Sequence, residues 1–177
     1  MADPGADDPT ARSPHATRVL AGAAVLLAIV VAIVLIARGG GGDADTGTVT
    51  GELGSKPTIE VPSGPPPADL VSNDIVTGDG ATAEQGDTVK VQYVGVDYST
   101  GKQFDASWDS GKPFSFQLGA GNVIPGWDQG VEGMRVGGRR ELIVPPDLAY
   151  GTQGQPPTIG PNATLVFVID LLDVQPG

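Results

Sequence analysis

The sequence contains no cysteine and only one histidine, and both features restrict its chemistry. Without cysteine there is no disulfide framework, no thiol nucleophile and no lipid-modified cysteine. The one histidine, His15, lies in the N-terminal tail, ahead of a long apolar run. The rest of the chain therefore cannot form a Ser-His-Asp triad, a Cys-His pair or a histidine-containing metal site. We expect no metal and no cofactor.

Basic residues are also few: the chain has 10 Lys and Arg against 21 Asp and Glu, a net charge of −11. Bulk electrostatics therefore argue against a nucleic-acid partner. The part of the chain after the apolar run contains aspartates that could form a carboxylate pair, namely Asp105, Asp109, Asp128 and Asp147. Turns and helix caps account for most aspartates, so glycosidase chemistry is a minor alternative.

One long apolar run stands near the N-terminus. Val19 to Ala37 comprises 19 residues without a charge, flanked by Arg18 and Arg38. A helix of that length reaches roughly 28 Å, which is close to the hydrocarbon thickness of a bilayer. We predict a single N-terminal transmembrane helix over 19–38, with a cleaved secretory signal as the alternative.

The charges around this run favour one orientation. Basic residues are in excess on its N-terminal side, which favours a cytoplasmic N-terminus and an extracytoplasmic domain. We therefore expect a single-pass protein of the cell membrane, or a secreted protein if the segment is cleaved. The complete division of the chain is a short tail at 1–18, the anchor at 19–38, a flexible linker at 39–54 and one folded domain at 55–177.

The residue pattern of the folded domain is typical of a β-protein with one short helix. The proline-rich stretch that opens it reads most simply as a linker, but Ile59 and Val61 alternate with polar neighbours and could form an edge strand. Further strands follow from alternation around Tyr93, Phe114, Leu142 and Phe167. Leu142 and Val144 share one strand face, so Arg139 and Arg140 at the start of that strand are expected on a solvated edge.

Two other segments do not alternate. Ile124 to Met134 reads IPGWDQGVEGM, in which Pro125 suits a first helical turn. Tyr150 to Asn162 is a long loop without predicted secondary structure. Loops of that length between strands are usually functional or disordered, and the flanking strands favour a functional loop.

Aromatic residues are scarce as well, and all nine lie between Tyr93 and Phe167. Such a concentration predicts an apolar pocket in that region. A pocket without nucleophile, metal or cofactor suits one reaction, rotation about a prolyl amide bond, whose barrier of roughly 20 kcal/mol arises from amide resonance. A dry apolar site disfavours the charge-separated planar amide relative to the twisted transition state.

The short sequence motifs that contain these aromatic residues resemble those of the FKBP family of peptidyl-prolyl cis-trans isomerases. They run in family order from about Asp79 to Leu172, as VQYVG, QFDAS, KPFSFQLG, VIPGWDQGVEGM, PPDLAYG and ATLVFVIDLL. The resemblance implies an FKBP-like α+β fold, with a five-stranded antiparallel sheet wrapped around one short helix. It also implies a monomeric bacterial isomerase, exported or membrane-anchored, that binds proline-containing polypeptides and FK506- or rapamycin-type macrolides.

The same resemblance assigns roles to individual residues. Trp127 is the expected pocket floor, and its walls are Tyr93, Phe104, Phe114 and Phe167. The Ile124 N–H, preceded by Val123, is the expected donor to a ligand carbonyl. The remaining polar and loop groups are Asp105, which faces the twisting amide, Tyr150, whose hydroxyl is a second donor, and Ile159, which covers one side. Catalysis is expected from Asp105, Tyr150, Phe167 and Tyr93.

Some positions fall outside this pattern. Ser110 stands where an arginine often pairs with the aspartate, Gln155 replaces a loop histidine, and Thr158 replaces an apolar loop residue. These departures leave a second hypothesis open, a non-catalytic binding or chaperone module that grips proline-containing partners. The aromatics without a pocket role are Phe116, expected in the core, and Tyr98 and Trp108, expected in turns or at the surface.

Overall fold

The computed structural model describes residues 47–177. The predicted tail, the predicted anchor at 19–38 and the first part of the predicted linker lie outside these residues. Within 47–177, no helix is both long enough and apolar enough to cross a bilayer.

A six-stranded antiparallel sheet forms the centre of the fold, in the order β3-β7-β8-β4-β5 with β6 also paired to β4. Its strands are β3 (Val71–Val76), β4 (Thr88–Asp97), β5 (Gln103–Ala106), β6 (Phe114–Gln117), β7 (Arg139–Val144) and β8 (Leu165–Gln175). The predicted number of five strands is wrong by one. The long strand β4 pairs with β6 along its first half and with β5 along its second half, so one edge holds two short strands.

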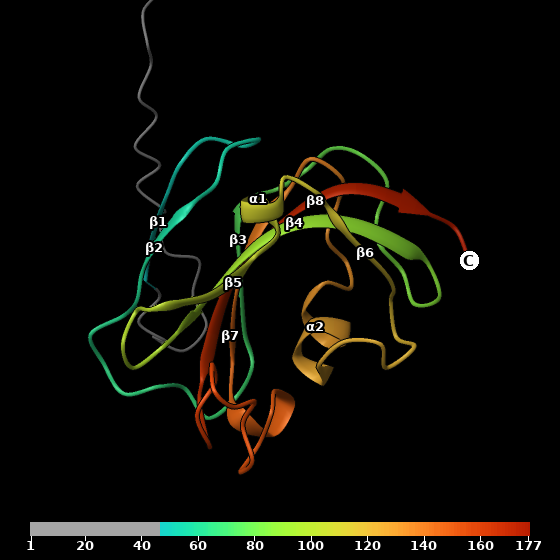
Figure 1. Cartoon of the computed structure of the whole chain (residues 1–177). Helices are drawn as coiled ribbons and strands as arrows, with labels where there is room; N and C mark the ends of the chain where they lie inside the picture. The colour runs from blue at the N-terminus through green and yellow to red at the C-terminus, as the bar shows by residue number, and fades with distance from the viewer. Residues whose placement is uncertain (1–46) are drawn as a thin grey trace, which may run out of the picture. The chain divides into compact units, whose positions relative to one another are not determined.

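The sheet curves around the short helix α2 (Pro125–Gly130), which lies against its concave face (Figure 1). This confirms the predicted helix with Pro125 in its first turn. Two glycines allow the helix to lie close to β7. A Cβ atom at Gly126 would stand 2.4 Å from Val144 Cγ1, and one at Gly130 would stand 2.6 Å from Leu142 Cδ1. The main apolar core lies between α2 and the sheet.

An N-terminal extension covers the opposite, convex face of the sheet. It forms a separate two-stranded sheet of β1 (Thr48–Thr50) and β2 (Thr58–Glu60), paired from Thr48 with Glu60 to Thr50 with Thr58. The stretch around Ile59 forms the edge strand that the sequence left open as the alternative to a linker. However, β1 lies inside 39–54, which the sequence predicted to be a flexible linker, so ordered structure begins before residue 55. Ile59 and Val61 pack against a second apolar cluster on this convex face.

Arg139 is buried on the convex face, so its predicted place on a solvated edge is wrong. Its side chain is 1% exposed and forms an ion pair with Asp170, from Nε to Oδ1 at 2.5 Å and from Nη2 to Oδ2 at 2.7 Å. The same guanidinium donates to the main-chain oxygens of Gly51 at 2.8 Å and Ser55 at 2.9 Å. Arg139 therefore joins the sheet to the extension.

Tyr98 is also buried rather than at the surface, because residues 61–66 fold over it. It is 5% exposed, and its hydroxyl donates to the main-chain oxygens of Gly64 and Pro65, each at 3.3 Å. Trp108, in the single-turn helix α1 (Ser107–Ser110), is half-buried against the same cluster. The sequence placed both residues in turns or at the surface, since it gave no sign of a covering segment.

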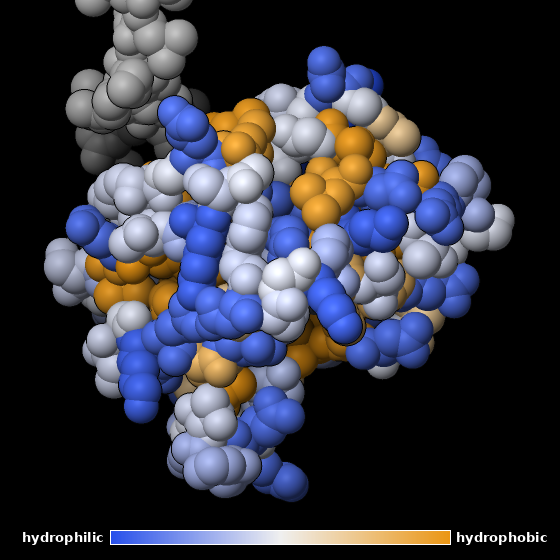
Figure 2. Space-filling view, turned by 45° about the horizontal axis from the view of Figure 1, so that its top comes forward, coloured by the Kyte–Doolittle hydropathy of each residue, from blue (hydrophilic) through white to orange (hydrophobic). Residues whose placement is uncertain are grey.

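The visible surface carries no continuous hydrophobic face. Figure 2 shows hydrophobic residues in separate patches, interrupted by hydrophilic side chains, on the side that it presents. Among the described residues, the large hydrophobic side chains that are exposed are Leu53, Phe114 and Leu172. Only Phe114 belongs to the predicted pocket.

Candidate active site

A cavity of about 190 Å³ opens between the concave face of the sheet, α2 and the loop that follows the 3-10 helix η1 (Pro146–Leu148). Its lining comprises Tyr93, Phe104, Asp105, Phe114, Asn122, Val123, Ile124, Trp127, Tyr150 and Phe167. The structure therefore brings together nine of the ten site residues that the sequence named. They come from β4, β5, β6, α2 with its preceding turn, the η1 loop and β8.

Trp127 forms the base of this cavity. The first turn of α2 positions it, because its N–H donates to the Ile124 oxygen at 2.9 Å. The indole is 4% exposed and makes edge-on contacts with the rings of Tyr93 and Phe167, at centroid distances of 5.0 and 5.3 Å. Its Nε1 has no acceptor within residues 47–177. The indole thus presents mainly an apolar surface to the cavity.

Aromatic rings from four strands, β4, β5, β6 and β8, form the walls. Phe104 and Phe167 meet edge to face at 5.6 Å, and Phe114 lies at the rim, where it is 40% exposed. Sequence reasoning missed Gly95, which makes room for two of these rings. A Cβ atom there would stand 2.6 Å from Phe104 Cζ and 2.9 Å from Phe167 Cε1. A glycine inside a strand pattern is the signal of such a close approach.

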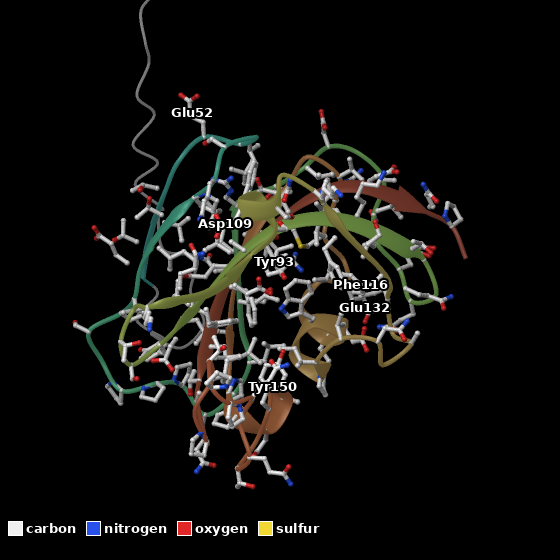
Figure 3. The ribbon with its side chains drawn as sticks, viewed as in Figure 1. Glu52, Tyr93, Asp109, Phe116, Glu132 and Tyr150 are labelled. Atoms are coloured by element: carbon white, nitrogen blue, oxygen red, sulfur yellow. The ribbon has the colours of Figure 1, made fainter. Side chains whose placement is uncertain are left out.

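Phe116 lies behind the wall, as the sequence expected. It is 5% exposed, and its ring stacks on Phe114 at 5.6 Å and contacts Trp127 at the same distance. Figure 3 shows Phe116 beside β6, whereas Tyr93 and Tyr150 lie toward the cavity from the sheet and from the η1 loop. Phe116 therefore supports the cavity without lining it.

The carboxylate of Asp105 is held by a neighbouring tyrosine. Tyr93 donates its hydroxyl to Asp105 Oδ2 at 2.5 Å, and the Ala106 N–H donates to Oδ1 at 2.8 Å. Burial raises the pKa of Tyr93, and the hydrogen bond and charge of Asp105 raise it further. Ser110 does not hold the aspartate, because its hydroxyl donates to the main-chain oxygen of Ser107.

Two donors at the cavity are available for a ligand. Within the described part of the chain, neither the Ile124 N–H nor the Tyr150 hydroxyl has an acceptor. Burial raises the pKa of Tyr150, and the nearby charge of Asp105 adds to this effect. Both tyrosine hydroxyls therefore stay protonated and can donate at neutral pH.

Two positions differ from the predicted lining. Ile159 does not line the cavity; it is 5% exposed and packs into the main core. Its bridge with Gln155 closes the tip of the loop, since its N–H donates to the Gln155 oxygen and its own oxygen accepts from the Gln155 N–H, each at 2.9 Å. Asn122 does line the cavity and was missed, because a lone asparagine after a glycine turn carries no pocket signal.

This site can bind an apolar ring and a carbonyl, but it lacks the groups for covalent chemistry. Residues 47–177 contain no cluster of His, Cys, Asp and Glu able to hold a metal ion. An aromatic cavity with two donors and one fixed carboxylate suits a proline ring and its adjoining amide. The curved antiparallel sheet around α2 and the aromatic cavity are the features expected of a prolyl isomerase.

The chain belongs to the FKBP-type peptidyl-prolyl cis-trans isomerase family, whose model matches residues 80–172. It is 60% identical over 120 residues to an FK506-binding protein of Streptomyces anulatus, covering 67% of this chain and 97% of the relative. It is 52% identical over 93 residues to the peptidyl-prolyl cis-trans isomerase FPR2 of Saccharomyces cerevisiae, covering 52% and 69%. The crystal structure of FkpA from Escherichia coli is similar, with a TM-score of 0.56, 45% identity and coverage of 60% and 48%. The protein is accordingly a peptidyl-prolyl cis-trans isomerase.

Proposed function

We propose that the protein accelerates X-Pro isomerisation during the folding of extracytoplasmic proteins, through the nine predicted residues that line the aromatic cavity. The observation that carries this proposal is the geometry of the cavity itself: a buried indole base, aromatic walls and two donors without acceptors. Together these groups provide a hydrophobic seat for a proline ring and hydrogen bonds for a peptide carbonyl.

The mechanism follows from what each group can contact. The proline ring packs on Trp127, beside Phe104 and Phe167. The carbonyl of the residue before or after the bond accepts from the Ile124 N–H, with the Tyr150 hydroxyl as a second donor. Amide resonance resists rotation, and loss of water around the amide weakens its charge-separated planar form relative to the twisted form. Asp105, held by Tyr93, faces the twisting amide. No covalent step is needed.

A proline-limited refolding assay with the full chain tests the activity, with Asp105→Val and Phe167→Ala as matched variants. Both variants remove a cavity group, and each is expected to lower kcat/KM at least severalfold. Refolding no faster than the uncatalysed rate with the wild-type chain would sink the proposal. Unchanged rates in both variants would show that another site performs the catalysis.

The extracytoplasmic location rests on the sequence. Its support is the uncharged run Val19–Ala37 with basic residues in excess on its N-terminal side. Protease added to intact cells should degrade the isomerase domain if it faces outward, and the mass of the native protein distinguishes a retained anchor from a cleaved signal. Full protection in intact cells, with degradation after lysis, would place the domain inside.

The alternative of a non-catalytic module drew on Ser110, Gln155 and Thr158. None of these residues lines the cavity, so the departures from the family pattern leave its lining intact. Gln155 and Thr158 instead form hydrogen bonds within the loop, and the Ser110 hydroxyl donates to the main-chain oxygen of Ser107. We therefore favour catalysis over passive binding.

Macrolide binding is a further part of the proposal. The name of the Streptomyces relative states that it binds FK506, and this chain presents the aromatic cavity described above. FK506 is expected to inhibit isomerisation competitively, and Phe114→Ala at the rim should weaken that inhibition. Equal catalysis with and without excess FK506 would contradict macrolide binding at the cavity.

A further inference from the structure

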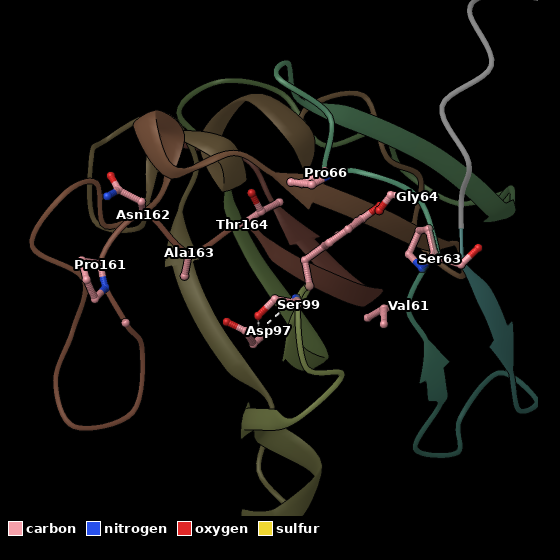
Figure 4. A pocket seen from close by; sticks show the side chains of 13 residues that line it. Val61, Ser63, Gly64, Pro66, Asp97, Ser99, Pro161, Asn162, Ala163 and Thr164 are labelled. Carbon is pink, nitrogen blue, oxygen red and sulfur yellow. Dashed lines mark hydrogen bonds between the residues drawn. The ribbon is translucent and has the colours of Figure 1, made fainter.

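A second cavity, larger than the isomerase cavity, lies outside the described active site. Its volume is about 610 Å³, against about 190 Å³ for the first. Three segments enclose it: residues 61–66 of the extension, 97–99 after β4 and 160–164 before β8. Figure 4 shows Ser63 and Gly64 on one side, Pro161 and Asn162 on the other, and Asp97 and Ser99 between them. Its size is in the range of ligand-binding pockets.

The two cavities have no lining residue in common, but they flank the neck of one loop. The Asn162 N–H donates to the Gly151 oxygen at 2.9 Å, which closes the neck. Asn162 lines the second cavity, and Gly151 directly follows Tyr150 of the isomerase cavity. One main-chain hydrogen bond therefore connects the residue after Tyr150 with a lining residue of the second cavity.

Rigid elements form the walls of the second cavity. Three of its lining residues are prolines, Pro62, Pro66 and Pro161. The extension is held over the buried Tyr98, whose hydroxyl donates to the main-chain oxygens of Gly64 and Pro65. Proline fixes one backbone angle, so these walls lose little conformational freedom when a ligand binds.

One charge faces this cavity. Asp97 is the only charged residue in the lining, and it forms no ion pair within residues 47–177. Its Oδ1 accepts from the N–H and hydroxyl groups of Ser99 and Thr100, at 2.6 to 3.0 Å. Burial raises the pKa of Asp97, but these hydrogen bonds outweigh burial and lower it. The carboxylate therefore stays ionised.

We propose that this second cavity binds client polypeptide beyond the proline, and that Asp97 selects a segment bearing lysine or arginine. The proposal rests on the isomerase function. An extended segment fits better than a single side chain, because the cavity is far larger than one side chain and its walls combine polar and apolar groups, as a peptide does. The net charge of −11 over the chain also favours a cationic segment.

The preference for a cationic segment is tested by measuring how fast the full chain isomerises peptides that differ only in their flanking residues. One short peptide contains only the X-Pro core, and longer peptides add a flanking lysine at successive positions on either side of the proline, each with a glutamine counterpart. At the best position, lysine is expected to raise kcat/KM about two- to fivefold over glutamine, the range of one partly exposed ion pair. High salt should remove this gain.

Two variants and one control locate the effect. Asp97→Asn keeps an oxygen for the Ser99 and Thr100 hydrogen bonds but removes the charge, so it should abolish the lysine gain and leave the short peptide unaffected. Ser63→Lys places a cation on the exposed side of the cavity and should have the same result, which covers the case in which Asp97→Asn fails to fold. Asp173→Asn, toward the far end of β8, should retain the gain.

A binding experiment separates this proposal from the isomerase function. A lysine-bearing peptide without proline should shift the amide resonances of Ser99, Asn162 and Thr164, and Asp97→Asn should remove the shifts. Equal rates for lysine and glutamine peptides at every position, or shifts confined to the isomerase cavity, would overturn the proposal. If the wild type shows these shifts but no isomerase activity, the isomerase function is refuted, whereas peptide binding in the second cavity still stands.

Discussion

Tyr93 Oη and Asp105 Oδ2 lie 2.5 Å apart, joining β4 to β5 across the wall of the isomerase cavity. The hydroxyl donates and the carboxylate accepts, since an ionised carboxylate has no proton to give. The aspartate thus has a fixed orientation that depends on a lining residue rather than on position 110. Tyr93 has two functions in one side chain, a ring in the wall and a hydroxyl on the carboxylate.

Tyr93→Phe should lower catalysis while retaining the wall. The ring stays, but Asp105 loses a charge-assisted hydrogen bond worth about 1.5 to 3 kcal/mol in typical cases. If the orientation of Asp105 matters to the transition state, kcat/KM should fall roughly tenfold, the equivalent of about 1.4 kcal/mol. The peptide assay measures it, with circular dichroism as the fold control. A rate within a factor of two of wild type would argue against a positioning role for the hydroxyl.

Phe114→Ala and Phe116→Ala form a matched pair, since the two rings stack at 5.6 Å but differ in exposure, 40% against 5%. Removing the rim ring should raise KM severalfold with little change in the unfolding free energy. Removing the buried ring should cost about 3 to 5 kcal/mol of that free energy, because it leaves a void in the core. Urea unfolding and peptide kinetics on both variants give the comparison. Equal destabilisation by the two variants would contradict it.

Glu141 predicts a pH-dependent stability. It is 1% exposed on β7, and neither carboxylate oxygen has a hydrogen-bond partner of regular geometry within the described chain. Burial raises its pKa from 4.5 to about 7, and Asn73 opposite it on β3 opposes this in part. The folded state therefore binds the proton more tightly than the unfolded state does. Protonation of Glu141 therefore contributes to the unfolding free energy. This contribution is complete below about pH 4.5 and is lost as the pH rises through 7.

Comparison with Glu141→Gln isolates that effect. From the size of the pKa shift, the wild type should lose about 3 kcal/mol of unfolding free energy relative to the variant between pH 4 and pH 8. Urea unfolding across this range measures the difference, and other titrating groups cancel because both proteins contain them. Parallel curves for the two proteins would show that Glu141 is ionised or solvated in the folded state.

Arg139→Leu should be more damaging than the double variant Arg139→Leu/Asp170→Leu. The single change leaves the carboxylate of Asp170 charged and unpaired in the core, at a cost of about 3 to 5 kcal/mol. The double change removes both charges, so its unfolding free energy should recover much of that loss. Both variants lose the guanidinium that holds the extension, so hydrogen exchange at Thr48–Glu60 should rise in both. A double variant as unstable as the single one would rule out the unpaired charge as the cause.

Local patterns in the sequence were sufficient for the concave side of the molecule. Alternation identified the strands around Tyr93 and Phe167, and Pro125 marked the helix that holds Trp127. The family resemblance then supplied the site, of which nine of ten residues line the cavity. The predicted place of Ile159 at the cavity was wrong, because the position of a residue in a loop does not determine whether its side chain faces the cavity or the core.

The convex side was less predictable, for a physical reason. Leu142 and Val144 identify one face of β7 as buried, and the same alternation implies a solvated opposite face for Arg139. That inference holds only for a sheet covered on one side. Here the extension covers the second face, through a pairing of Thr48–Thr50 with Thr58–Glu60 and contacts to strands far along the chain. The residues near position 139 give no indication in the sequence that the N-terminal extension contacts Arg139.

The guanidinium of Arg139 meets the extension at two main-chain oxygens, those of Gly51 and Ser55. Every amino acid offers the same carbonyl, so this attachment does not depend on the side chains of Glu52 and Leu53, whereas Gly51 and Gly54 have positive φ angles that favour glycine. Mutational drift there is tolerated as long as the backbone path and its length are kept. Insertions and deletions, by contrast, shift the oxygens out of register with the fork of the guanidinium. A library of substitutions at 52 and 53 should therefore contain many folded members, and a library of single-residue deletions there few.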